Sequence, residues 1–280
     1  MEHTNQQVGR RAFVATSLAS GFALAVSPVS AQTITTDATD LVAGEIKIGG
    51  MPAYRAQPAT GKSFPLILVV SEIFGVHEHI KDVCRRLAKV GYMAIAPELF
   101  ARQGDVSKMA DVNLILTEVI AKAPDEQVMR DLDATASWAK QSGKLDGDRV
   151  GITGFCWGGR IVWLYAARGG PGRTPKAGAA WYGRLSNAVN ALQTTTAMDV
   201  GSKLKAPVLG LYGGQDSGIP IGHIEMMRRE LAGSTKLPSE IVVYADAPHG
   251  FNADYRPSYR KADADDAWKK MLAWMKKNGV

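Results

Sequence analysis

The sequence predicts an α/β protein in which a mostly parallel sheet carries helices on both faces and follows an N-terminal β-hairpin. Three observations support this fold class. From Leu66 onward, short apolar runs alternate with segments of helical periodicity, which favours a parallel sheet. Residues 41–48 and 51–57 form two strand-like runs joined by Gly49-Gly50, the pattern of a hairpin. The chain has 280 residues, 46% of them hydrophobic, enough for one domain with a substantial core.

The elements after the hairpin are expected in the following order. Strands begin near Leu66, Tyr92, Val150, Ala177, Val208 and Ile241. Helices cover residues 77–90, 124–141, 157–167, 221–231 and 262–277. In the last helix, Trp268, Met271, Leu272 and Met275 form an apolar stripe that predicts packing against the sheet. Residues 103–123 and 184–203 interrupt the alternation without strong strand signals, and we expect them to cover the functional site.

The first 31 residues have the pattern of an export signal. The pair Arg10-Arg11 precedes a mild apolar stretch over residues 14–26, and small residues end at Ala31. This pattern predicts a twin-arginine signal peptide, residues 1–31, cleaved after Ala31. The stretch is too short for a membrane span of about 20 residues, so no stable membrane anchor is expected. Residues 32–280 would then be a single domain in the periplasm or outside the cell; the alternative is a disordered tail with an accidental arginine pair.

The net charge restricts the class of partner. The whole chain carries +6, and residues 32–280 carry +5, from 31 Lys and Arg against 26 Asp and Glu. There is no block of basic residues and no basic stripe interleaved with aromatic residues, which argues against nucleic-acid binding. A small-molecule substrate, anionic in character, fits this modest positive charge, and we expect a monomer.

The segment Gly154-Phe155-Cys156-Trp157-Gly158 is the most informative motif in the chain. It lies between the apolar run 149–153, which predicts a buried strand, and a helix over 157–167. Gly-x-nucleophile-x-Gly between a strand and a helix is the nucleophile elbow of α/β-hydrolases, here with Cys in place of Ser. The turn strains the backbone of Cys156, and the N-terminus of the following helix favours its thiolate.

Two residues downstream occur in the order that a catalytic triad in this fold requires. Asp216 lies in a turn-rich loop after the strand 206–212, and His249 lies in the loop after the strand 240–244. Of the five histidines, His249 alone has both the order and the context. Taken separately, Asp216 could be a turn residue and His249 an exposed loop residue. Their joint placement predicts a Cys156–His249–Asp216 triad.

The two cysteines are not expected to form a disulfide. Cys84 recurs at helical spacing with Ile80, Val83 and Leu87, which predicts a core position on one helix. Cys156 belongs to the elbow. No Cys/His spacing is typical of a zinc site, and no glycine-rich loop matches a phosphate or dinucleotide motif, so no metal and no cofactor is expected.

With these residues in place, the chain after about residue 40 resembles the dienelactone hydrolase (carboxymethylenebutenolidase) family of α/β-hydrolases. The resemblance is carried by six segments: 70–75 (Val-Ser-Glu-Ile-Phe-Gly), 96–102 (Ala-Pro-Glu-Leu-Phe-Ala-Arg), 154–159 (Gly-Phe-Cys-Trp-Gly-Gly), 181–183 (Trp-Tyr-Gly), 212–216 (Tyr-Gly-Gly-Gln-Asp) and 249–251 (His-Gly-Phe). Their order matches the family throughout.

The resemblance implies further site residues. Glu72, which closes the strand 65–71, would hydrogen-bond the resting thiol and help to activate it. The backbone N–H groups of Ile73 and Trp157 would form the oxyanion hole. Arg102 would hold a substrate carboxylate, and Tyr182 would contact the substrate.

The chain departs from the family pattern at two positions. Ala253 stands where the family has a second arginine, and Arg256 follows three residues later as an alternative substrate-binding residue. Glu98 stands where the family more often has Asp.

The resemblance and the triad together predict a cysteine-dependent hydrolase that opens a small lactone or cleaves a small ester through a thioester intermediate. Three alternatives remain open from the sequence. One is a thioesterase or carboxylesterase with the same triad. Another is an exported binding protein that keeps the fold without turnover. The third is a thiol redox protein, which is disfavoured because no second cysteine lies near Cys156 in the sequence.

Overall fold

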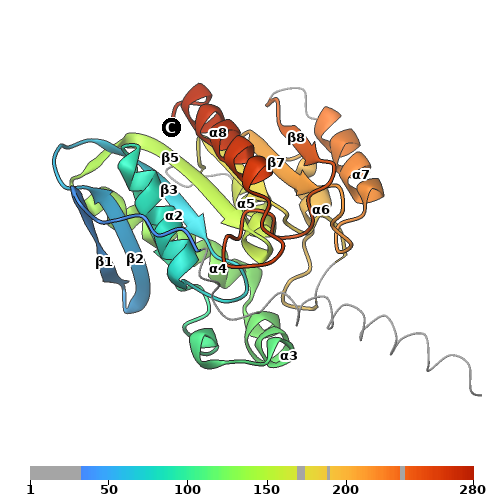
Figure 1. Cartoon of the computed structure of the whole chain (residues 1–280), viewed down its shortest axis with the longest axis horizontal. Helices are drawn as coiled ribbons and strands as arrows, with labels where there is room; N and C mark the ends of the chain where they lie inside the picture. Colours follow the sequence, from blue (N-terminus) through green and yellow to red (C-terminus); the bar gives the residue numbers. More distant parts are fainter. Residues whose placement is uncertain (1–32, 169–173, 188–189, 234–236) are drawn as a thin grey trace, which may run out of the picture.

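A computed structural model of the chain describes residues 33–168, 174–187, 190–233 and 237–280 (Figure 1). The signal peptide predicted for residues 1–31 lies outside the described residues.

The described residues form strands and helices in the alternation that the sequence predicts. The strands are β1 (Leu41–Ile48), β2 (Met51–Pro58), β3 (Phe64–Val70), β4 (Met93–Pro97), β5 (Leu145–Phe155), β6 (Ala177–Trp181), β7 (Val208–Gly213) and β8 (Glu240–Tyr244). The longer helices are α2 (Glu78–Lys89), α4 (Asp125–Gln141), α5 (Trp157–Ala167), α7 (Ile221–Ala232) and α8 (Lys261–Lys277). Shorter helical segments are η1 (Val106–Lys108), α3 (Val112–Leu114), η2 (Ile115–Val119), η3 (Ile120–Lys122) and α6 (Ala197–Gly201).

All eight strands belong to one sheet with the order β1-β2-β4-β3-β5-β6-β7-β8. The hairpin strands β1 and β2 pair antiparallel, and β2 pairs antiparallel with β4. From β4 to β8 every pairing is parallel. The parallel strands therefore end at the same edge of the sheet, which is where open α/β sheets bind ligands.

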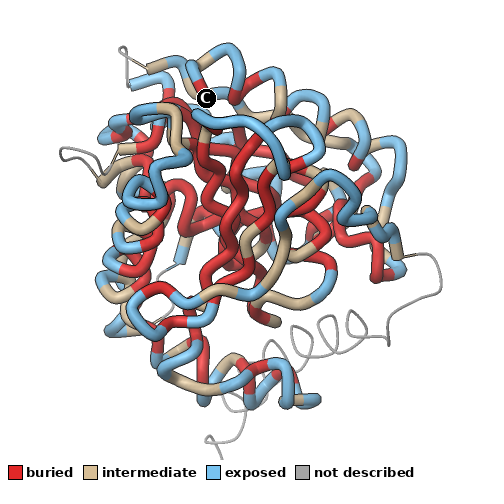
Figure 2. Tube along the Cα trace, turned by 90° about the vertical axis from the view of Figure 1, so that its left-hand side faces the viewer, coloured by how far each residue is buried: buried red, intermediate tan, exposed pale blue. Residues whose placement is uncertain are grey.

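Helices cover the sheet on both faces. In Figure 1, α2 and α8 lie in front of the sheet and α4 and α5 lie behind it. The strands between these layers are buried on both sides, which explains continuous apolar runs such as residues 64–70 in β3. Figure 2 shows the buried residues gathered along the central strands. Among the described residues, no helix combines the length and the apolar character needed to cross a membrane.

The predicted elements are present, with differences at their ends. β5 begins at Leu145, before the expected Val150, because Leu145 pairs with Phe64 across a register irregularity. Cys84 is fully buried on α2, as its spacing predicts, and both cysteines are free. The segments expected to cover the site contain short helices that the sequence did not reveal. The two segments meet where Gln193 donates to the carbonyl oxygen of Ala123 at 3.0 Å.

Candidate active site

Cys156 lies in a sharp turn between β5 and α5. Its backbone has φ 53° and ψ −113°, in the left-handed region that non-glycine residues rarely adopt. The turn allows no side chains on the flanking glycines. A Cβ on Gly154 would lie 2.3 Å from the carbonyl oxygen of Gly158, and a Cβ on Gly158 would lie 2.4 Å from that of Val70. The elbow motif is therefore required by close backbone approach, and the predicted strand–turn–helix context is present.

Two backbone N–H groups are available beside this turn. Trp157 is the first residue of α5, where the N–H has no partner within the helix and adds to the positive end of the helix dipole. Ile73 lies in the loop that follows β3. Among the described residues, neither its N–H nor that of Trp157 donates a backbone hydrogen bond in a turn, loop or cap. Because Val70 pairs with Gly154, the two loops leave neighbouring strands at the same level. Both N–H groups are thus free to bind an oxyanion.

His249 and Asp216 lie on the loops that follow β8 and β7. His249 Nδ1 is 2.7 Å from Asp216 Oδ2, and the Gly218 N–H donates to Oδ1 of the same carboxylate at 2.9 Å. Asp216 is buried, whereas Asp246, the other acid near these loops, is exposed. Burial opposes a charged imidazole, but the adjacent Cys156 sulfur and the Asp216 carboxylate together raise the pKa of His249 to about 10. The arrangement favours the imidazolium form of His249 beside Cys156 and Asp216.

The two loops are held together by backbone contacts. The N–H of Gln215 donates to the carbonyl oxygen of Ala247 at 3.0 Å, and that of Gly214 donates to Tyr244 at 2.7 Å. A Cβ on Gly213 would lie 2.3 Å from the carbonyl oxygen of Ala247. The glycines preceding Asp216 thus let its loop approach the loop of His249 closely.

Glu72 is a fully buried carboxylate at the end of β3. Its Oε2 accepts a hydrogen bond from the Tyr255 hydroxyl at 2.5 Å, lies 3.3 Å from His77 Nε2, and lies 3.8 Å from Arg256 Nη2. Its Oε1 is buried and has no hydrogen-bond partner in the described part of the chain. Burial alone would favour the neutral acid, but the charge of Arg256 and the hydrogen bond from His77 hold the pKa of Glu72 well below its ordinary value. Glu72 is therefore ionised, with one oxygen free to accept a proton or a hydrogen bond.

Tyr182 and Arg256 lie close to both Cys156 and Glu72. The Tyr182 ring packs 5.1 Å from the ring of His249, and its buried hydroxyl has no partner among the described residues. Burial and the charge of Glu72 raise the pKa of this hydroxyl, so it is a donor at neutral pH. Arg256 packs against the Phe74 ring at 4.9 Å, and its buried Nε is likewise unpartnered. Two unused donors therefore accompany the thiol.

The structure does not bring Arg102 into this cluster. Its guanidinium pairs with both oxygens of Asp131 on α4, at 2.6 and 2.8 Å, and its side chain is 53% exposed. A guanidinium that is already paired with one carboxylate must break that pair before it can bind another. The structure thus places Arg102 in an ion pair outside the cluster, and it places Arg256 within the cluster.

Sequence reasoning missed two residues of the cluster, His77 and Tyr255. His77 lies five residues after Glu72 in the same loop, and Tyr255 lies six residues after His249. Their proximity along the chain to two candidate catalytic residues was the available signal. Among the residues that the structure describes, no group of three His, Cys, Asp or Glu side chains is arranged to hold a metal ion.

Comparisons with known proteins find relatives over almost the whole chain. Residues 51–279 match the model of the "Dienelactone hydrolase family". A Methylorubrum extorquens protein named "Putative carboxymethylenebutenolidase" is 58% identical over 278 residues, covering 98% of this chain and 94% of the relative. An Escherichia coli K12 protein of the same name is 49% identical over 271 residues, covering 95% and 98%.

A solved structure shows the same similarity. The crystal structure titled "Putative Dienelactone Hydrolase" from Klebsiella pneumoniae superposes with a TM-score of 0.80 at 49% identity, covering 84% of this chain and 98% of the other. The six segments that carried the resemblance all lie within residues 51–279, the part of the chain that matches the family model.

Proposed function

The chain belongs to the dienelactone hydrolase family of α/β-hydrolases, which act on lactone and ester bonds, and from that premise we propose that it hydrolyses its small-molecule substrate through a Cys156 thioester. The observation that carries the proposal is the position of Cys156. It occupies the strained elbow at the N-terminus of α5, and its sulfur acts on the pKa of His249, which is hydrogen-bonded to Asp216.

The first half of the reaction forms the thioester. The Cys156 thiolate attacks the carbonyl carbon, and the N–H groups of Ile73 and Trp157 stabilise the oxyanion; each such donor is typically worth about 3 kcal/mol. When the intermediate collapses, the C–O bond to the leaving group breaks. The released alkoxide or enolate takes the proton of the His249 imidazolium. In a lactone the leaving group stays attached, so the ring opens.

The second half restores the free thiol. His249, now neutral, removes a proton from water, and the resulting hydroxide attacks the thioester carbonyl. Asp216 fixes the orientation of the imidazole and stabilises the imidazolium that forms. Collapse of the second tetrahedral intermediate releases the carboxylate product and regenerates the thiolate–imidazolium pair. Between turnovers the imidazolium returns its proton to the sulfur, and Glu72, ionised and with Oε1 free, would accept the hydrogen of this resting Cys156 thiol.

The free donors in the cluster favour an anionic substrate. Arg256 carries a positive charge beside Cys156 and has an unpartnered Nε, and the Tyr182 hydroxyl is also unpartnered within the described residues. A carboxylate on the substrate would satisfy both and would fix the position of the scissile bond.

A substrate screen on the purified protein tests the proposal. It compares carboxylate-bearing unsaturated lactones, simple aryl esters and thioesters, with Cys156→Ala as the control. We expect turnover and a covalent acyl-enzyme, seen by mass spectrometry, in the parent protein alone. Faster hydrolysis of thioesters than of matched lactones would instead favour a thioesterase. Binding without turnover on any of these substrates would identify a binding protein.

Export through the twin-arginine route is part of the proposal. Arg10→Lys combined with Arg11→Lys keeps the charge but removes the pattern that the receptor reads. We expect the unprocessed protein to collect in the cytoplasm. Unchanged periplasmic accumulation would leave an ordinary secretory signal as the explanation.

We further propose that the mature protein is a monomer, which its sedimentation velocity would test.

A further inference from the structure

The three side chains that contact Glu72 Oε2 differ in their access to solvent. The side chain of Arg256 is 2% exposed, and Tyr255 is buried as well. The side chain of His77, by contrast, is 24% exposed, although its Nε2 lies 3.3 Å from Oε2. Among these three contacts, His77 is therefore the one that joins the buried carboxylate to water.

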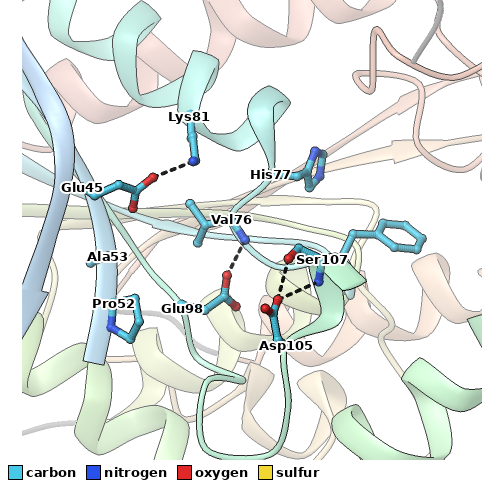
Figure 3. Close-up of a pocket in the computed structure, with 10 residues that line it drawn as sticks. Glu45, Pro52, Ala53, Val76, His77, Lys81, Glu98, Asp105 and Ser107 are labelled. Carbon is cyan, nitrogen blue, oxygen red and sulfur yellow. Dashed lines mark hydrogen bonds and ion pairs between the residues drawn. The ribbon is translucent and has the colours of Figure 1, made fainter. Parts of the chain in front are cut away.

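His77 also lines a pocket of about 180 Å³ beside the loop between β3 and α2 (Figure 3). Its other walls include Glu98 after β4, and the ion pair between Lys81 and Glu45 spans it at 2.5 Å. Glu98 accepts a hydrogen bond from the N–H of Val76 at 2.8 Å. A polar space of this size holds several water molecules. His77 thus contacts the buried carboxylate through Nε2, is partly exposed, and also belongs to the lining of a water-accessible pocket.

The surroundings of His77 keep its imidazole neutral at ordinary pH. Burial lowers the pKa of His77, and its electrostatic interactions with His79 and Arg256 act in the same direction, against the opposing effect of Glu72. The His79 ring stacks at 6.0 Å and the Tyr255 ring packs edge-on at 4.9 Å. On the pocket side, Lys81 opposes protonation, whereas Glu45, Glu98 and Asp105 favour it. Because a carboxylate needs a donor, Nε2 carries the proton and Nδ1 is the acceptor.

We propose that His77 is a positioning residue that holds Glu72 in its ionised form and exchanges protons between this carboxylate and water in the pocket. The Nε2 proton passes to Glu72 Oε2 while Nδ1 takes a proton from a hydronium ion or buffer acid in the pocket. The imidazole ends in its other tautomer, and the reverse sequence returns it. Only N–H and O–H bonds form and break.

The consequence concerns the thiol. Arg256 interacts electrostatically with both Glu72 and Cys156, which shows that the two groups share one environment. Without the His77 hydrogen bond, burial would favour the neutral form of Glu72 at higher pH. A neutral Glu72 no longer repels the thiolate, so the state of His77 sets the pH at which Cys156 reactivity changes. This step rests on the part of the proposed function that places Glu72 beside the thiol.

The test is the rate of Cys156 alkylation by iodoacetamide between pH 4 and 9, in the full chain, with Cys156→Ala as the background control. In the parent protein Glu72 stays ionised, and its titration produces no step in this range. In His77→Ala we expect a step in the alkylation rate to appear within this range, with about tenfold faster alkylation below the step than in the parent at the same pH. If His77→Ala is unstable, His77→Asn serves in its place. Asparagine is a good N-cap residue for α2 but is too short to reach Glu72, so we expect the same step in its profile. Profiles that superimpose on that of the parent would overturn the proposal.

Added imidazole distinguishes proton exchange through the pocket from a structural role. In His77→Ala the lost ring leaves space that opens to the pocket, and we expect imidazole to shift the step back toward the parent profile. Tyr255→Phe is the matched control, because it removes another donor to the same oxygen without enlarging the pocket. An equal effect of imidazole on both variants, or none on His77→Ala, would overturn the proposal. Alkylation needs no hydrolysis, so a failed substrate screen would reject the proposed function and leave this test unaffected.

Discussion

The chemistry of Cys156 depends on a sulfur in a turn that tolerates few changes. Cys156→Ser keeps the size of the side chain but replaces a thiol with a hydroxyl, which is far less nucleophilic at neutral pH. We expect Cys156→Ser to hydrolyse esters more slowly than the parent, and Cys156→Ala to lose on the order of 10⁴-fold or more in kcat. Steady-state kinetics on an aryl ester checks both. Circular dichroism should show an intact fold, and near-parental activity of Cys156→Ala would show that another residue is the nucleophile.

Arg256 and Arg102 make opposite predictions for substrates that carry a carboxylate. Arg256 is buried beside Glu72, and its Nε has no partner among the described residues, whereas Arg102 is paired with Asp131. For the carboxylate substrate, Arg256→Lys should weaken transition-state stabilisation, calculated from the ratio of kcat/KM values, by about 1–3 kcal/mol, the worth of a hydrogen bond to a charged group. The kcat/KM for a neutral ester should change little. Arg102→Lys should leave the ratio between the two substrates unchanged. A ratio altered only by Arg102→Lys would restore the role that the sequence resemblance implied.

At the scale of elements, the elbow depends on how closely α5 approaches β3. A Cβ on Gly158 would lie 2.4 Å from the carbonyl oxygen of Val70, a backbone atom that cannot turn aside. We expect Gly158→Ala to destabilise the fold by about 1–3 kcal/mol, as overpacking does in a core. Gly222→Ala is the control, since that helix glycine has nothing within 4 Å and should be stabilised by up to about 1 kcal/mol. Chemical denaturation measures the free energy of unfolding of both variants. A Gly158→Ala variant as stable as the parent would contradict the close approach of α5 to β3.

The elements that could be predicted from the sequence are those with strong local signals. The helix 157–167 was predicted to the residue because the elbow glycines fix its start. The start of β5 was missed because Asp146, Gly147 and Asp148 interrupt its apolar run, and only pairing with β3 extends it. The short helices between β4 and α4 were missed because each is too short for a recognisable period.

At the scale of the whole molecule, the site combines residues that the sequence cannot place together. The order of Cys156, Asp216 and His249 predicts a triad because each follows a strand of one parallel sheet. The Glu72 cluster follows no such rule, since Tyr255 reaches Glu72 from 183 residues away. Nor could the sequence show that Arg102 pairs with Asp131, which lies on a different element, 29 residues along the chain. Side-chain pairing across elements is a property of the packed structure.

Asp254 links the loop after His249 to α2 and should make the stability of the whole fold sensitive to acid. The carboxylate contacts His79 Nδ1 at 3.0 Å and Arg86 Nη2 at 2.6 Å. Burial opposes its ionisation, but His79 and Arg86 hold the pKa of Asp254 below its ordinary value. A carboxyl whose pKa is lower in the folded state stabilises the protein above its unfolded pKa, about 3.9 for Asp, and this stability is lost as the pH falls through the folded pKa.

The expected outcome is therefore a difference in stability that depends on pH. Asp254→Asn should lose about 1–3 kcal/mol of unfolding free energy at pH 7, the worth of hydrogen bonds to charged groups. Below about pH 4 the carboxylate takes up a proton in the unfolded parent, and at still lower pH it does so in the folded parent, so the two proteins should approach each other in Tm. Thermal unfolding from pH 3 to 7 measures this, with Asp246→Asn as the control because Asp246 is exposed. A constant difference in Tm across the range would show that Asp254 acts through its shape and not its charge.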